Sequence, residues 1–169
     1  GKLRANVADV RVDSNTELTM AQFVRVSLHH DLNDEFSLAF TWGWDDWSAL
    51  DSVFVSVPER EGALQKNWDD TYHYAAGLEY RASDKWHFTT GVSYDTNPVS
   101  AHDRTADLPV DRQIRFSGGT RYQLRDNMTV GGYINYKDLG SAKIHGQRWG
   151  GEYENNSIWA FAINLNWTL

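Results

Sequence analysis

The last thirteen residues, Ser157 to Leu169, constrain the fold of this chain more than any other stretch. Every second residue is apolar, and small or polar residues fill the positions between them. This period of two is typical of a β-strand that is apolar on one face only. The apolar face carries Trp159 and Trp167, which would lie roughly 20 Å apart along the axis of a barrel with tilted strands. An aromatic residue at each edge of such an apolar band suits the two interfaces of a bilayer, but a strand of a soluble sandwich or lipocalin would alternate as well.

The composition is compatible with a membrane barrel without requiring one. The 169 residues suffice for one domain, and 41% of them are hydrophobic. No transmembrane helix is expected, because the sequence contains no run of eighteen apolar residues. Eight Trp and eight Tyr exceed the needs of an ordinary core. The absence of cysteine excludes disulfide scaffolds and thiolate metal sites, and the net charge of −7 argues against a nucleic-acid partner. Because neither a starting Met nor a signal peptide precedes Gly1, the chain is interpreted as mature, processed or truncated.

The same alternation recurs along the chain and predicts seven strands joined by alternately short and long connections. The predicted strands span 17–32, 36–57, 71–81, 86–95, 113–124, 128–136 and 157–169. Short turns are expected at 33–34, 83–84 and 125–127, and long loops at 58–69, 96–111 and 138–156. Residues 1–16 are interpreted as the end of an earlier strand followed by a loop. After Asp46 the parity of the apolar positions changes, which predicts a β-bulge in the second strand.

The two faces of these strands decide between a membrane barrel and a soluble one. Aromatic residues recur eight positions apart on the apolar face and are expected at the membrane interfaces: Tyr72, Tyr80, Trp86, Tyr94, Trp159 and Trp167. The opposite face carries polar and charged residues: Arg25, His29, Glu79, Arg81, Arg115, Arg121 and Asn135. A lipocalin needs an apolar interior, and burying these groups unpaired would cost several kcal/mol each. A wet lumen accommodates them, so the pattern favours an all-β, antiparallel transmembrane barrel with seven or eight strands present here.

Five sequence blocks resemble the C-terminal half of the FadL-type long-chain fatty-acid and hydrocarbon transporters of the outer membrane. They are Trp68-x-Asp70-Thr71, Gly77-x-x-Tyr80, Gly91-x-x-Tyr94-Asp95-x-x-Pro98-Val99, Pro109-Val110-Asp111-Arg112-Gln113 and Gly119-x-x-Tyr122. The Trp47-Ser48 pair is similar to a Trp-Ser strand of the family, and the similarity runs from about Glu17 to Leu169.

The resemblance implies a fourteen-stranded barrel, an N-terminal hatch and a lateral opening toward the bilayer. Two features depart from that pattern: the hatch has no counterpart in this chain, and Leu169 replaces the Phe that commonly ends such chains. Seven strands are an odd number, and eight could close if residues 1–12 paired. We expect residues 1–169 to be the C-terminal part of a single outer-membrane barrel domain.

Five residues are candidates for ligand binding. Arg115 and Arg121 point inward and could attract a carboxylate, although lumen arginines usually pair with neighbouring acids. Trp68 and Asp70 match the family pattern at the mouth of a strand, where a Trp is more often an interface anchor than a substrate contact. Arg104 lies in an outer loop, where it could bind a ligand or brace the loop.

No catalytic or metal-ligating set emerges from the sequence. The adjacent His29 and His30 lie on opposite faces of a strand and cannot share an ion, and the acidic residues of 103–111 do not converge. The sequence therefore predicts a non-enzymatic, monomeric protein without cofactor or nucleic-acid partner. We expect it to move long-chain fatty acids or similar hydrophobic compounds passively across a Gram-negative outer membrane, in contact with outer-membrane lipid. A small structural or adhesive barrel is the alternative, and an outer-membrane lipase is a third hypothesis.

Overall fold

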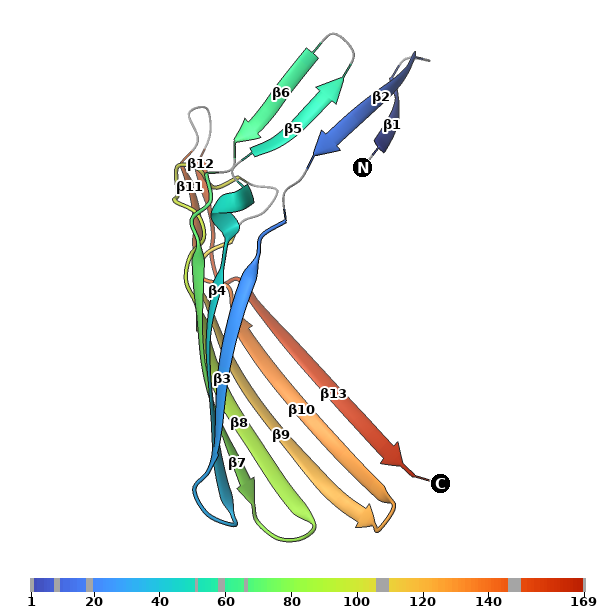
Figure 1. Cartoon of the computed structure of the whole chain (residues 1–169), viewed down its shortest axis with the longest axis vertical. Coiled ribbons are helices and arrows are strands. Elements are labelled where there is room, and N and C mark those ends of the chain that lie inside the picture. The colour runs from blue at the N-terminus through green and yellow to red at the C-terminus, as the bar shows by residue number, and fades with distance from the viewer. Residues whose placement is uncertain are drawn as a thin grey trace.

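The computed structural model of the chain describes residues 2–7, 10–17, 20–50, 52–57, 60–65, 67–105, 110–145 and 150–168. Its main element is a seven-stranded antiparallel sheet with the order β13-β10-β9-β8-β7-β4-β3, curved and tilted as Figure 1 shows. The strands are β3 (Phe23–Asp31), β4 (Phe36–Asp45), β7 (Thr71–Arg81), β8 (Trp86–Asp95), β9 (Gln113–Arg125), β10 (Met128–Asp138) and β13 (Ser157–Trp167). Successive strands of this sheet are neighbours, which confirms the seven predicted strands and their meander. We call this sheet the wall.

The wall has a turn end and a loop end. Three short connections join β3 to β4, β7 to β8 and β9 to β10, and all lie at the lower end in Figure 1. The first closes because Asn33 Oδ1 accepts hydrogen bonds from the backbone N–H groups of Glu35 and Phe36, at 2.9 and 2.8 Å. Ser83 Oγ accepts from the N–H groups of Lys85 and Trp86 in the same way. Side chains that bond to their own turn therefore set the register of the first two hairpins.

The two faces of the wall differ as the alternation predicts. On the apolar face large side chains stay exposed, up to 87% for Ile163 and 72% for Phe161. On the polar face Ser37 and Ser93 are buried, so this is the more enclosed side of the curved sheet. We call it the inner face. Because exposed apolar side chains on this scale need a non-aqueous surrounding, the outer face suits lipid and the inner face suits water.

Several predictions about the connections at the loop end are wrong. The segment predicted as the end of a strand and a loop, 1–16, contains β1 (Lys2–Val7), which pairs with β2 (Val10–Glu17), and the predicted 58–69 loop contains β6 (Arg60–Gln65). These strands and β5 (Ser52–Val57) build a separate sheet of order β1-β2-β5-β6 beyond the wall (Figure 1). The predicted 138–156 loop contains a further hairpin, β11 (Ala142–His145) with β12 (Gly150–Tyr153). The two hairpins of the separate sheet are joined by the pairing of β2 with β5, which are far apart in the chain, and such pairing leaves no mark in local alternation.

The predicted bulge after Asp46 is also wrong. The strand β4 ends at Asp45, and a short 3-10 helix, η1 (Trp47–Leu50), separates it from β5, which belongs to the other sheet. The change of apolar parity therefore marks the end of a strand. In the described part of the wall, a register shift lies between Met128 and Thr129 instead. The predicted strand 17–32 is likewise divided, because β2 ends at Glu17 and β3 begins at Phe23.

The wall is an open sheet in the part of the chain that is described, since β3 and β13 each have one neighbour. No helix among the described residues is long and apolar enough to cross a membrane. The buried apolar side chains gather at the loop end: Trp68, Val99, Ala142 and Ile144. We call residues 67–70, 96–105, 110–112 and 139–145 the cap.

Candidate functional site: the cap and the inner face of the wall

Arg104 is the centre of the cap. The residue is 5% exposed, and its guanidinium donates to the backbone oxygens of Val110 at 2.7 Å, Lys143 at 2.6 Å and Val99 at 3.2 Å. It also donates to Asn97 Oδ1 at 3.2 Å and lies 3.6 Å from Asp111. One buried cation thus joins the segments after β8, before β9 and after β10. Its donors are engaged within the protein, an arrangement that suits bracing of the cap.

Trp68 and Asp70 hold the junction between β4 and β7. Trp68 is 8% exposed and packs against Trp47 of η1, with ring centroids 5.4 Å apart. The carboxylate of Asp70 accepts a hydrogen bond from Trp44 Nε1 at 3.0 Å and one from the Ser48 backbone N–H at 3.1 Å. Hydrogen bonding to the Ser48 side chain, then to its backbone N–H, holds the pKa of Asp70 below its ordinary value. Both residues therefore face protein partners.

A second carboxylate ties two cap segments together. Asp103 accepts from Ser100 Oγ at 2.6 Å and from Asn67 Nδ2 at 2.8 Å. The hydrogen bond from the Ser100 side chain, followed by that from Asn67, lowers the pKa of Asp103. Backbone bonds from Asp69 N to the oxygen of Pro98 and from His145 N to the oxygen of Ala101, both 2.7 Å long, add to this connection. The cap is consequently a cross-linked unit.

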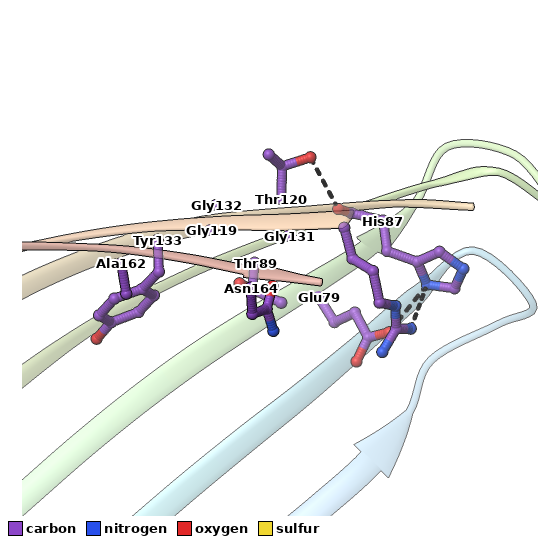
Figure 2. Close-up of a pocket in the computed structure, with 11 residues that line it drawn as sticks. Glu79, His87, Thr89, Gly119, Thr120, Gly131, Gly132, Tyr133, Ala162 and Asn164 are labelled. Atoms are coloured by element: carbon purple, nitrogen blue, oxygen red, sulfur yellow. Dashed lines mark hydrogen bonds and ion pairs between the residues drawn. The ribbon is translucent and has the colours of Figure 1, made fainter. Parts of the chain in front are cut away.

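The turn end of the inner face carries a chain of ionisable side chains contributed by four strands. Arg121 Nη2 lies 3.2 Å from His87 Nδ1, which lies 3.4 Å from Glu79 Oε1. Glu79 is also 3.5 Å from Arg81 Nε, and Arg81 Nη2 is 3.5 Å from Asp31 Oδ1. Figure 2 shows the side chains of His87 and Glu79 at the edge of this region of the inner face. The lumen arginines here are engaged with neighbours, as is usual for such residues.

Beside this chain the inner face is hollowed where glycine and small residues replace larger ones. The hollow encloses about 290 Å³ and is lined by Thr89, Gly119, Gly131, Tyr133 and Asn164 together with the Glu79, His87 and Arg121 side chains (Figure 2). Gly131 leaves room for the Asn164 side chain of the adjacent strand, since a Cβ at this position would displace Asn164 Oδ1.

Arg115 lies on the same strand as Arg121, nearer the loop end. Its register partners are Ser93 on β8 and Lys137 on β10, and all three belong to the inner face. The five candidate residues therefore form two groups. Trp68, Asp70 and Arg104 belong to the cap and have different partners there, whereas Arg115 and Arg121 lie apart on the inner face. A role in ligand binding stays a prediction for all five.

Aromatic residues form two rows on the outer face. At the turn end Phe36 stacks on Tyr80 with centroids 4.7 Å apart, and Trp86 lies 4.5 Å from Tyr122. At the loop end Trp42 lies 6.5 Å from Tyr72, and Tyr136 lies 4.8 Å from Trp159. The predicted interface residues are all exposed on this face: Tyr72, Tyr80, Trp86, Tyr94, Trp159 and Trp167. Sequence reasoning missed Phe36, Trp42, Tyr122 and Tyr136, which become members of the rows only once the strand register is known. Their place at membrane interfaces stays a prediction.

The described residues contain no group of three or more acidic or histidine side chains that could hold a metal ion. The arrangement consists of a two-faced wall, a braced cap and a lumen surface with paired charges and shallow hollows. Such a surface can contact a solute that moves past it.

Comparisons with known proteins agree with this architecture. A sequence model of the outer membrane protein transport family (OMPP1/FadL/TodX) matches residues 3–168. The long-chain fatty acid transport protein of Escherichia coli K12 is 25% identical over 154 residues, which cover 90% of this chain and 34% of that protein. Outer membrane protein P1 of Haemophilus influenzae is 26% identical over 145 residues, which cover 85% of this chain and 31% of that protein.

The fold is also similar to that of a solved protein. The crystal structure of a Pseudomonas aeruginosa FadL homologue matches with a TM-score of 0.81 and 17% identity, over 94% of this chain and 38% of that one. This chain thus spans about a third of the length of the relatives it matches. Because the family match extends over almost all of its residues, this chain belongs to the OMPP1/FadL/TodX family of transport proteins in the outer membrane of Gram-negative bacteria.

Proposed function

We propose that this chain forms part of the wall and the outer cap of a larger barrel that lets hydrophobic compounds, such as long-chain fatty acids, pass the outer membrane without an energy source. The observation that carries this proposal is the two-faced wall. Large apolar side chains stay exposed between two aromatic rows, while charged residues and hollows occupy the inner face. This arrangement separates lipid from an aqueous lumen.

Two findings support a larger barrel. The sheet has unpaired edges at β3 and β13 in the described part of the chain, and a lipid-exposed sheet edge is not tolerated in a bilayer. The chain also covers about a third of the length of its relatives, one of which is named a long-chain fatty acid transport protein. Further strands would close the sheet, and the whole barrel acts as a monomer in this proposal.

Passive movement suits the chemistry of the solute. Transfer of a fatty acid from water to an apolar phase gains about 0.8 kcal/mol per CH₂, so the compound partitions into lipid once it has passed the outer polar layer. The barrel then has to supply only a path past that layer. The charged inner face prevents strong retention of the alkyl chain along that path.

The experiment is uptake of a radiolabelled C16 fatty acid by a Gram-negative strain that lacks its own fatty-acid transporter and expresses the full-length protein containing this chain. We expect uptake above that of the vector control at equal amounts of assembled barrel. Uptake equal to the control, with the barrel assembled in the outer membrane, contradicts the proposal and favours a structural or adhesive barrel.

The contribution of the cap is tested in the same cells. A protein that lacks residues 96–111 loses the segment centred on Arg104, and we expect its uptake to change relative to the intact barrel. Unchanged uptake in this assembled variant removes the cap from the transport path.

A further inference from the structure

Two cations on the inner face, Arg115 and Lys137, have no carboxylate of their own. They are register partners on β9 and β10, so their side chains extend from neighbouring positions of the same face. Other inner-face arginines are engaged: Arg25 Nη2 lies 2.8 Å from Asp45, and Arg81 lies 3.5 Å from Glu79. Within the described ranges, Arg115 and Lys137 have neither a hydrogen bond nor an ion pair between their side chains and another group.

The nearby carboxylates are already occupied. Asp95, which attracts Lys137 electrostatically, is bonded to His73 Nδ1 at 2.7 Å. Asp138, the next residue on β10, lies 3.7 Å from Arg112. Like charges directly opposite each other on adjacent strands destabilise a sheet unless an anion lies between them. The pair is therefore a local excess of positive charge in a protein whose net charge is −7.

Ser93 supplies an independent observation at the same place. It is the register partner of Arg115 on β8, the residue is 7% exposed, and its Oγ has no hydrogen-bond partner. A buried hydroxyl without a partner is uncommon, because desolvation of the group is not compensated. Ser93 and Arg115 both line a second hollow of about 280 Å³, whose floor consists of small residues such as Gly77, Gly91 and Ser117. A buried hydroxyl without a partner in the lining of a hollow that a free guanidinium also lines indicates a missing acceptor.

We propose that this hollow binds the carboxylate of the transported amphiphile. The guanidinium of Arg115 accommodates the two carboxylate oxygens, Ser93 Oγ donates a further hydrogen bond, and Lys137 adds charge. This inference rests on the proposed function and assigns the residues that would hold the acid head group of its substrate.

The neighbouring wall offers a place for the alkyl chain. Tyr133 lines this hollow and also the one at the turn end. There the small residues Gly119, Gly131 and Ala162 leave the inner face without large projecting side chains (Figure 2). A chain attached to the bound carboxylate lies across this glycine-rich surface and toward the turn end. The hollow is shallow and opens to the lumen, so binding is transient, as passage requires.

The test measures equilibrium binding to the purified full-length barrel of three C16 probes, a fatty acid, the fatty alcohol and the alkyl trimethylammonium ion. We expect the acid to bind about tenfold more tightly than the alcohol, the factor that corresponds to 1.4 kcal/mol. The ammonium probe should bind more weakly than the alcohol. Arg115→Gln should remove the preference for the acid and leave the affinity for the alcohol unchanged.

Three further variants make the result specific. Lys137→Gln and Ser93→Ala should each reduce the preference for the acid, and they test the site if Arg115→Gln does not assemble. Arg25→Gln removes an inner-face charge that is already paired with Asp45, so it should keep the preference.

The possible failures are distinguishable. A preference for the acid that survives in Arg115→Gln and Lys137→Gln overturns the carboxylate site, as does equal binding of acid and alcohol to the unchanged barrel. In both cases the proposed transport stands. Absence of binding of all three probes, together with absence of uptake, overturns the proposed function and the site with it.

Discussion

The wall and the cap differ in where their side chains are buried. In the wall the backbone ladder is continuous from β3 to β13, yet the largest apolar side chains remain exposed, as Phe161 and Ile163 show. In the cap there is little regular structure, but Val99, Ala142 and Ile144 are almost completely buried around Arg104. The large apolar side chains of the wall therefore lack a core of their own among the described residues, and in the proposed barrel they contact lipid. The cap has an internal core like that of a water-soluble protein.

Along the strand axis, the buried core lies at the loop end, in the cap, whereas the proposed ligand-binding surface lies on the inner face of the wall. In the cap, the side chains of Arg104 and Asp70 have specific hydrogen-bond partners, because ordered loops need internal cross-links. Charges of the inner wall lie at a water-filled surface, where pairing is optional and Arg115 stays free for a ligand in our proposal. Substitutions in the two regions should consequently affect different properties of the protein.

The largest effect is expected for Arg104→Met. This change leaves Asp111 and several backbone oxygens of the cap without their buried partner, and loss of one member of a buried ionic network costs about 3–5 kcal/mol. We expect the cap to open locally, while the wall stays assembled, and the segment 96–105 to be cleaved faster by added protease. Arg112→Met is the matched control, because Arg112 is 42% exposed and has one ion pair at 3.7 Å. Equal cleavage of the two variants contradicts a cap centred on Arg104.

The next effect concerns the outer face of the wall. Ile163 lies midway between Trp159 and Trp167, and Ile163→Arg should lower the free energy of unfolding in phospholipid vesicles by about 2–4 kcal/mol, the cost of an arginine at the bilayer midplane. Ala160→Arg, on the inner face of the same strand, should have a much smaller effect. Urea titration of the full-length barrel measures both. A larger loss for Ala160→Arg would reverse the assignment of the two faces.

A smaller effect on the stability of the cap is expected from Asp70, and only at acidic pH. The pKa of its carboxyl is lower in the folded cap than in the unfolded chain, so its stabilising contribution is complete above the ordinary aspartate pKa of about 3.9 and is lost as the pH falls below it. Protection of the Ser48 amide against hydrogen exchange should decline in that range. Asp70→Asn should remove this dependence, and Asp69→Asn, at an exposed neighbour, should retain it. Identical pH profiles for the two variants would contradict the role of Asp70.

The smallest effect is expected for Lys143→Gln. Lys143 Nζ lies 3.7 Å from Glu152, but its side chain is 57% exposed, and such pairs contribute about 0–1 kcal/mol. Cleavage of the cap should therefore remain close to that of the unchanged protein. A loss as large as that of Arg104→Met would show that surface pairs, and not the buried cation, hold the cap.

Much of the wall could be predicted, and little of the cap. The alternation of Trp159, Phe161 and Ile163 with small residues states directly which side of β13 is apolar, and the turn residues Asn33 and Ser83 mark where strands end. The hairpins β5–β6 and β11–β12 were not predicted, because β6, β11 and β12 are short and their own patterns are weak. For Arg104, binding and bracing were both open from the sequence, since the carbonyl groups that surround it come from two connections, the one between β8 and β9 and the one that follows β10.

The alternation within each strand is enough to define a two-faced wall, since the direction of a side chain from a strand follows from the residue's own position. The sequence also carried the similarity to a family of outer-membrane transport proteins. Which charges have partners depends on the folded sheet. Arg121 meets His87, whereas Arg115 faces Lys137, because the register between adjacent strands brings these side chains together. That register is a cooperative property of the whole sheet and cannot be read from one strand.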